Sequence, residues 1–220
     1  MLLMSDKIIR NTVNFVKETL EGAEGGHDWF HMERVWNTAR YIREQEGAGD
    51  RLTIELAAIL HDISDAKFNG GDEKRGSRLA GEFLLRQQVE QEKVDHVRLI
   101  IQHVSYKGGF TQDTISSIEF QIVQDADRLD AMGAIGIARA FNYGGYKNRA
   151  IHNPTMPLRE YDDPGSYHKS DAPTINHFYE KLLKLKDLMN TRTGKAMAEE
   201  RHEYMLRFLD RFYKEWDPGK

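Results

Sequence analysis

The apolar residues of this 220-residue chain recur every three or four positions over most of its length, and alternating apolar–polar runs are scarce. One such stripe extends from Ile8 to Leu20 and is closed by Gly22. This spacing places apolar side chains on one face of a helix, and such a face must be buried against other helices. The sequence therefore predicts an all-α fold, built as a compact helical bundle.

The same spacing predicts where the remaining helices lie. They are expected over 29–47, 51–63, 76–90, 92–104, 116–129, 132–141, 174–189 and 194–216. The helix that starts at Ser116 also has the spacing of a capping box, because Glu119 follows three residues later. No internal repeat or low-complexity tract interrupts this series.

Residues 142–173 break the pattern, since they contain four of the five prolines together with Gly144 and Gly145. Loops of about 30 residues are uncommon inside compact domains, and those that occur are often functional. We expect one domain over 1–220, with a loop insert at 142–173 and C-terminal helices at 174–216. Two uses of the insert remain open: a lid that covers a substrate, or a scaffold packed permanently on the last two helices.

Composition restricts the classes of partner and ligand. The formal net charge of −4 leaves no basic excess, so we expect no nucleic-acid partner. No apolar run approaches the ~18 residues of a membrane span, and no targeting segment is apparent, so a cytoplasmic protein without a membrane partner is expected. The absence of cysteine leaves His, Asp and Glu as the strong side-chain metal ligands.

Four such residues lie near the ends of predicted helices: His31, the adjacent pair His61 and Asp62, and Asp127. Two imidazoles and two carboxylates form a mixed nitrogen and oxygen set that suits Mn²⁺, Mg²⁺, Fe²⁺, Co²⁺ or Ni²⁺. Neighbouring residues diverge by about 100° around a helix, so the pair can share an ion only beyond the helix end. Helix bundles commonly hold metals on inward-facing side chains, and we predict a divalent metal ion at these four residues.

Each residue also has an ordinary structural explanation. A histidine at a helix end is often satisfied by a backbone carbonyl, and an aspartate cluster such as the one around Asp127 can form an exposed face. Two observations favour the metal site. Asp62 opposes the helix dipole at a C-terminus, and apolar Ile122 and Val123 accompany Asp127.

In this order, His31, His61-Asp62 and Asp127 resemble the H…HD…D signature of the HD-domain superfamily of metal-dependent phosphohydrolases. Residues 27–35, 60–65 and 125–131 are similar to three motifs of a bacterial subgroup that includes nucleotide pyrophosphohydrolases. The resemblance is specific over 27–140 and looser elsewhere. It implies a single HD-type domain that hydrolyses a nucleotide or a related phosphate ester or anhydride, with pyrophosphate release from nucleoside triphosphates as one such reaction.

The expected mechanism is attack by a metal-bound water. Asp62 or Asp65 is predicted to position that water, and Asp28 is as well explained as an N-cap of its helix. His103 ends the helix at 92–104, where the resembling subgroup carries a histidine near the metal. We predict a catalytic role for it, as a phosphate contact or a second metal ligand, with an ordinary helix-end histidine as the alternative.

A phosphate substrate also requires cations. Lys74, Arg128 and Lys181 are the predicted substrate-binding residues, although most lysines and arginines of such a chain are solvated. The alternatives for the function are a 5′-nucleotidase, a cyclic-nucleotide phosphodiesterase or an alarmone hydrolase of the same superfamily. A related di-iron oxygenase and a regulatory module that binds metal and nucleotide without turnover also remain. A small-molecule nucleotide or phosphate is the expected partner, and a homodimer is left open.

Overall fold

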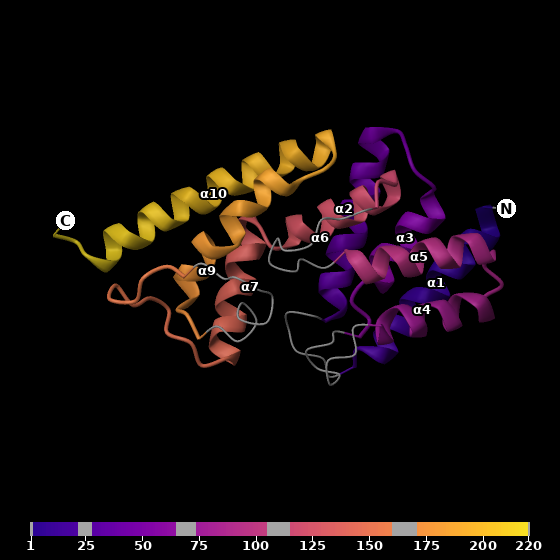
Figure 1. The fold of residues 1–220 in the computed structure, drawn as a ribbon, viewed down its shortest axis with the longest axis horizontal. Helices are drawn as coiled ribbons and strands as arrows, with labels where there is room; N and C mark the ends of the chain where they lie inside the picture. The colour runs from indigo at the N-terminus through magenta and orange to yellow at the C-terminus, as the bar shows by residue number, and fades with distance from the viewer. Residues whose placement is uncertain (1, 22–27, 65–73, 105–114, 160–170, 220) are drawn as a thin grey trace. The chain divides into compact units, whose positions relative to one another are not determined.

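A computed structural model of the chain describes residues 2–21, 28–64, 74–104, 115–159 and 171–219 (Figure 1). All regular secondary structure in these ranges is helical, which confirms the all-α prediction. The α-helices are α1 (Leu2–Thr19), α2 (Trp29–Glu46), α3 (Arg51–Leu60), α4 (Arg75–Arg86), α5 (Gln91–His103), α6 (Ile118–Asp130), α7 (Gly133–Tyr146), α9 (Thr174–Glu180) and α10 (Arg192–Trp216). A 3₁₀ helix, η2 (Leu182–Leu188), follows α9.

The chain divides into two compact units, and the boundary falls inside α6, between Asp127 and Arg128. The first unit contains α1 to α5 and the larger part of α6. The second contains the last residues of α6 together with α7, α9, η2 and α10. None of the described helices combines the length and the apolar character that crossing a membrane requires.

In the first unit, α3 is the central helix and packs against α1, α2 and α5, while α4 lies alongside α5 (Figure 1). All residues of α3 from Thr53 to Leu60 are buried. A helix that is apolar on nearly every side must be surrounded by other helices, which explains this position. Burial of α3 brings its C-terminal end, and with it His61, into the interior.

The start of α3 is fixed by Asp50. Its carboxylate accepts hydrogen bonds from the backbone N–H of Thr53 at 2.9 Å and pairs with Lys93 Nζ at 2.8 Å. Burial alone would raise the pKa of Asp50, but the hydrogen bonds from Lys93 and Thr53 and the charge of Lys93 outweigh it, so the pKa lies below its usual value. Asp50 is therefore an N-cap whose charged form is stabilised by folding.

The predicted capping box of α6 is wrong in detail. Ser117, not Ser116, caps the helix, since its Oγ accepts from the backbone N–H of Phe120 at 3.3 Å. Glu119 does not return to the cap. Its Oε1 accepts from the backbone N–H of Asp50 at 2.8 Å, and this bond ties the start of α6 to the start of α3.

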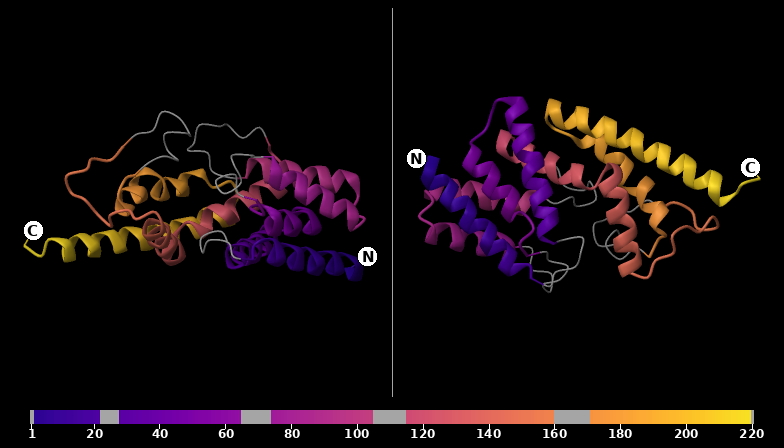
Figure 2. Two further views of the ribbon diagram at one scale, coloured as in Figure 1. Left: turned by 90° about the horizontal axis from the view of Figure 1, so that it is seen from below. Right: turned by 180° about the vertical axis from the view of Figure 1, so that it is seen from behind.

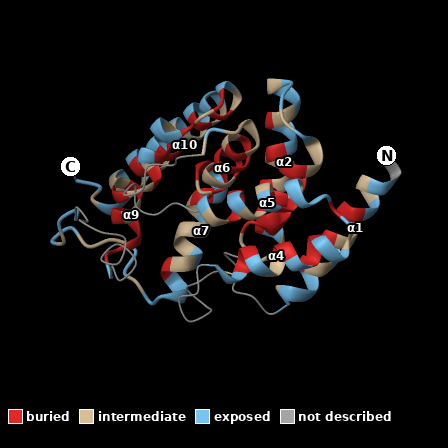
Figure 3. Cartoon of the chain, turned by 45° about the vertical axis from the view of Figure 1, so that its right-hand side comes forward, coloured by how far each residue is buried: buried red, intermediate tan, exposed pale blue. Residues whose placement is uncertain are grey.

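In the second unit, α7 packs against α9 and α10, and η2 packs against the same two helices. Phe141, Phe178 and Phe208 meet with ring centroids 5.8–6.1 Å apart, so each of α7, α9 and α10 contributes one ring to a shared core. The 25-residue α10 continues without interruption (Figure 2). Buried and exposed residues alternate along it with helical spacing (Figure 3).

Further predicted boundaries are corrected, and α3, which was expected to reach 63, ends at Leu60. The helix expected to end at Phe141 continues to Tyr146, because Gly144 is a packing residue rather than a helix breaker: a side chain there would collide with Thr174 Oγ1. The region expected as one helix over 174–189 is divided into α9 and η2 at Lys181. The helix expected to reach 90 ends at Arg86.

The part of the predicted insert that follows α7, residues 147–159, is held against α9 and α10. The backbone N–H groups of Thr174 and Ile175 donate to the carbonyls of Ala150 and Ile151 at 2.9 and 3.0 Å. The His152 ring makes an edge contact with Trp216 of α10, with centroids 4.9 Å apart. These contacts favour the scaffold explanation for 147–159, while residues 160–170 lie outside the described part of the chain.

Candidate metal centre

His31 enters the site from the first turn of α2. Asp28 is the N-cap of this helix, and its Oδ1 accepts from the backbone N–H of His31 itself at 3.0 Å. The structure therefore confirms the N-cap explanation for Asp28. Because the cap bonds to the backbone N–H of His31, it fixes the position of the backbone from which the buried imidazole extends.

His61 enters from the opposite kind of helix end, as the C-cap residue of α3. Its Nδ1 lies 2.9 Å from the carbonyl oxygen of Ala58 and donates to it. This bond orients the ring and turns Nε2 away from α3. A backbone partner of this kind on the far ring nitrogen is typical of histidines that bind a metal through the other nitrogen.

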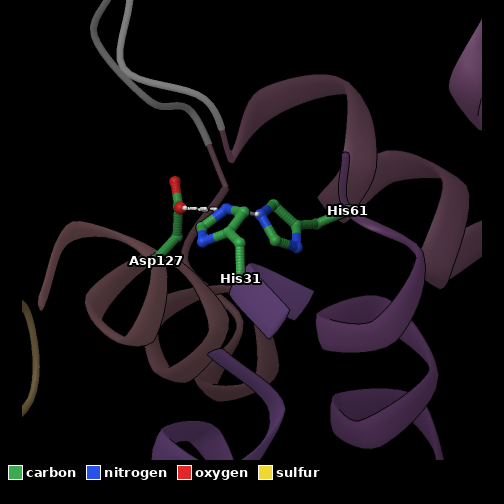
Figure 4. Close-up of side chains that lie close together, drawn as sticks. All are labelled: His31, His61 and Asp127. Atoms are coloured by element: carbon green, nitrogen blue, oxygen red, sulfur yellow. Dashed lines mark hydrogen bonds and ion pairs between the residues drawn. The ribbon is translucent and has the colours of Figure 1, made fainter. Parts of the chain in front are cut away.

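The two imidazoles and the carboxylate of Asp127 converge (Figure 4). The Nε2 atoms of His31 and His61 are 3.2 Å apart, and Asp127 Oδ1 lies 3.6 Å from the first and 3.5 Å from the second. Ligand atoms about 2.1 Å from a divalent ion lie about 3.0 Å apart at adjacent octahedral positions and about 3.4 Å apart in a tetrahedron. The triangle therefore has the size of one face of a metal coordination shell.

The electrostatics of the cluster agree with its geometry. Burial lowers the pKa of His61, but the hydrogen bond and charge of Asp127, the charge of Asp62 and the Ala58 carbonyl outweigh it and raise the pKa to about 9. The site thus stabilises a positive charge at the point where the three side chains meet. A divalent cation supplies such a charge and displaces the proton when it binds.

The site is closed on one side and accessible on the other. His31 and His61 are 2% and 5% exposed, whereas the Asp127 side chain is 22% exposed. An ion held by the three residues would therefore be shielded behind the imidazoles and accessible near the carboxylate. Such access is what separates a catalytic metal site from a closed structural one.

Asp62, the fourth predicted ligand, is not brought into this triangle. It lies half-buried in the turn after α3, where its charge contributes to the raised pKa of His61. Adjacent residues leave a helix in divergent directions, which accounts for the presence of His61 in the group with Asp127 and the absence of Asp62 from it. Its role as a ligand stays a prediction.

Lys74 and His103 lie at the same end of the first unit as the turn that carries Asp62. A Cβ added to Gly76 at the start of α4 would lie 3.5 Å from the carbonyl oxygen of Ser64 in that turn. At the end of α5, Gln102 Nε2 donates to Ser77 Oγ at 3.0 Å, which joins the two helix ends. Both predicted residues are exposed there, and their roles stay predictions.

The other predicted residues lie elsewhere. Arg128 belongs to the second unit, where its Nη1 donates to the backbone carbonyl of Leu188 at the end of η2. Lys181 separates α9 from η2 in the same unit. Asp65 lies outside the described residues. Substrate binding by Arg128 and Lys181 and catalysis by Asp65 stay predictions.

Sequence reasoning missed Ser64. Its Oγ is buried and has no hydrogen-bond partner among the described residues, although it lies two residues after Asp62 and beside the start of α4. An unsatisfied buried hydroxyl costs free energy unless a ligand or water completes it. No spacing signal marks a single serine in a turn, so only the fold identifies it.

The helical fold and this His, His, Asp triangle define a class of protein that hydrolyses phosphate compounds with a divalent metal. The family model described as "HD domain" matches residues 29–132, a range that includes all four predicted ligands. This chain belongs to the HD-domain family and is a metal-dependent phosphohydrolase.

Individual relatives extend the similarity over almost the whole chain. The Bacillus subtilis protein YpgQ is 38% identical over 203 residues, which cover 91% of this chain and 90% of YpgQ. The crystal structure of an HD-superfamily hydrolase from Bacillus thuringiensis shares 46% identity and a TM-score of 0.76, covering 97% of this chain and 98% of that one. The crystal structure of YpgQ in complex with ADP has 34% identity, a TM-score of 0.76 and 98% coverage of both chains.

Proposed function

We propose that this phosphohydrolase acts on a nucleotide, and that release of pyrophosphate from a nucleoside triphosphate is its reaction. The observation that carries the proposal is the ligand triangle of His31, His61 and Asp127, accessible on the side of the carboxylate. A nucleotide as substrate is further supported by the complex of the similar protein YpgQ with ADP.

His31, His61 and Asp127 would hold the metal, with Asp62 as the proposed fourth ligand. The mixed nitrogen and oxygen donors suit Mn²⁺, Mg²⁺, Fe²⁺, Co²⁺ or Ni²⁺. When bound, the ion lowers the pKa of a coordinated water and neutralises charge on the phosphoryl oxygens. The Ala58 carbonyl holds the His61 imidazole and Asp28 holds the backbone of His31 before the metal arrives, which reduces the ordering needed when it binds.

The protein's own groups would bind and orient the phosphates. A phosphate-binding role for Lys74 is supported by the closeness of the first turn of α4 to the turn after α3, since a Cβ added to Gly76 would lie 3.5 Å from the Ser64 carbonyl oxygen. Backbone N–H groups at a helix N-terminus favour anions, and the Ser64 hydroxyl is available for a further hydrogen bond. Asp62 or Asp65 would orient the attacking water, and His103 would contact a phosphate.

The decisive experiment is product analysis of a nucleotide panel with Mn²⁺, Mg²⁺, Co²⁺ or Ni²⁺ added. We expect a nucleoside monophosphate and pyrophosphate, with oxygen from H₂¹⁸O in one product. His61→Gln should abolish turnover. Asp210→Asn, which alters an exposed pair with Lys214 on α10, serves as the matched control and should not.

Other outcomes would redirect the proposal. Orthophosphate from a monophosphate would indicate a 5′-nucleotidase, and opening of a cyclic ester would indicate a phosphodiesterase. Pyrophosphate removal from guanosine tetraphosphate would indicate an alarmone hydrolase. Tight nucleotide binding without product under every metal would instead support a regulatory module and contradict the proposed reaction.

A further inference from the structure

The metal ligand Asp127 lies in the last turn of α6, three residues before the helix ends at Asp130. The last four carbonyl groups of a helix have no partner within it, and helix ends fray. A metal ligand in such a turn therefore needs further contacts that hold the turn in place. Residues packed against the end of α6, beyond Asp127, make these contacts.

The first contact is an ion pair at Asp130. Its side chain is only 6% exposed, and its Oδ2 lies 2.8 Å from Arg139 Nη1 of α7. A carboxylate at a helix C-terminus opposes the helix dipole, and a buried carboxylate requires a partner. Arg139 supplies the compensating charge, so the position of the terminal residue of α6 depends on it.

The second contact is made by Arg201 of α10. Its Nη1 donates to the backbone carbonyl of Leu129 at 2.5 Å, a second hydrogen bond to a carbonyl of the last turn that also accepts from the N–H of Met132. Burial lowers the pKa of Arg201, and this effect outweighs the negative charges of Asp130 and Glu200, which would raise the pKa. A guanidinium is desolvated here in order to reach the helix end.

The residues that connect α6 to α7 pack closely against the side chain of Arg201. Gly133 adopts a φ of +66°, and a Cβ at this position would lie 3.0 Å from Arg201 Cγ. The N–H groups of Ala131 and Met132 close the turn by donating to the carbonyls of Arg128 and Leu129 at 3.1 and 3.0 Å. The end of α6 is thus tightened, turned by a glycine and held by two arginines.

We propose that Arg139 and Arg201 are positioning residues for the metal ligand Asp127. They fix the last turn of α6 through Asp130 and Leu129, and the fixed turn aims the Asp127 carboxylate at His31 and His61. The inference rests on the metal centre of the proposed function but on no particular substrate. A purely structural role in the second unit is the competing explanation, and the two differ in what happens to metal affinity.

The test compares Arg139→Met and Arg201→Met with Arg211→Met, whose guanidinium makes an exposed pair with Glu215 on α10. Mn²⁺ affinity is measured by calorimetry, and amide exchange of residues 127–132 is measured in the metal-free protein. We expect both variants to bind Mn²⁺ about 10- to 100-fold more weakly and to exchange faster in this turn. Arg139→Lys should recover part of the affinity, and the control should match the wild type.

Mn²⁺ affinity within twofold of the wild type, together with a lowered Tm, would overturn the proposal. If Arg139→Met does not fold, Asp130→Asn removes the same ion pair with little change in size and should weaken Mn²⁺ binding in the same direction. Both readouts are independent of turnover. If the substrate proves not to be a nucleotide, the Mn²⁺ affinities and exchange rates still test the role of the two arginines. If these measurements contradict that role, the proposed nucleotide substrate is unaffected.

Discussion

The Nε2 atoms of His31 and His61 lie 3.2 Å apart, although the two residues are thirty positions apart in the chain. Since His61 Nδ1 donates to the Ala58 carbonyl, a neutral His61 accepts at Nε2 a hydrogen bond from the Nε2–H of His31. A protonated His61 or a cation near the two rings adds a positive charge, which Asp127 balances. The folded protein thus brings two imidazole nitrogens and a carboxylate close enough together to hold one cation.

Metal loading should therefore stabilise the protein. At a free Mn²⁺ concentration 100-fold above its dissociation constant, mass action adds about 2.7 kcal/mol to the free energy of unfolding. Calorimetry with and without Mn²⁺ should show the transition move to higher temperature, and a chelator should reverse it. An unchanged transition in metal-titrated protein would contradict a metal centre at this cluster.

Asp127→Asn should abolish turnover and weaken metal binding, because a neutral amide is a poorer ligand than a carboxylate. The metal-free variant should also be slightly less stable at pH 7, since the Asp127 charge favours the protonated form of His61. Asp95→Asn, at an exposed residue that pairs with Arg98, is the control for surface charge. Full activity of Asp127→Asn with metal present would place the ligand elsewhere.

Asp50→Ala should lower the free energy of unfolding by about 1 kcal/mol at pH 7 through loss of the α3 cap. The lowered pKa of Asp50 gives this loss a pH dependence. The stabilising charge is fully present above the ordinary aspartate pKa of about 4 and disappears as the pH falls through the lower folded value. Urea titrations between pH 3 and 7 should show the gap from the wild type narrow at the acid end. A gap independent of pH would rule out a contribution from the charge.

Adjacent glycines of α7 should respond oppositely to alanine. Gly144→Ala should destabilise the protein by about 1–3 kcal/mol, because its Cβ would collide with Thr174 Oγ1. Gly145 has no atom within 4 Å of an added Cβ, so Gly145→Ala should stabilise the helix by about 0.5–1 kcal/mol. Thr174→Ala should rescue the first variant in a double-mutant cycle. Equal effects at the two positions would show that packing between α7 and α9 does not decide the choice of glycine.

Amide exchange at Thr174 and Ile175 should be slow with and without nucleotide, since both N–H groups donate to the segment at 147–159. A lid would give the other result, with fast exchange that slows when a nucleotide is added. Arg159 provides a separate check on whether exposed ion pairs help to hold this segment. Its Nη1 pairs with Asp171 at 2.8 Å on the exposed surface. Arg159→Met should therefore leave the Tm of the protein almost unchanged.

The helix order could be predicted from the sequence, and so could the three side chains that the structure brings together into a group able to hold a metal. Periodicity reports which faces are buried, and His31, His61 and Asp127 occupy a recognisable order along the chain. Contacts between residues far apart in the chain could not be predicted, because they leave no pattern in the neighbouring sequence. Glu119 has capping-box spacing but bonds to Asp50, and Gly144 resembles a helix breaker but packs on Thr174. Arg139 and Arg201 are, in sequence, two cations among 31.

The edge contact between His152 and Trp216 makes the intrinsic fluorescence of Trp216 sensitive to the structure around it. Trp29 and Trp36 belong to the first unit and Trp216 to the second, so the three indoles of the chain are divided between them. Indole emission depends on nearby imidazole, and separation of the ring from His152 should alter its intensity. In a chain in which phenylalanine replaces Trp29 and Trp36, all tryptophan emission would come from the second unit. Its melting could then be followed by fluorescence while the first unit is titrated with metal.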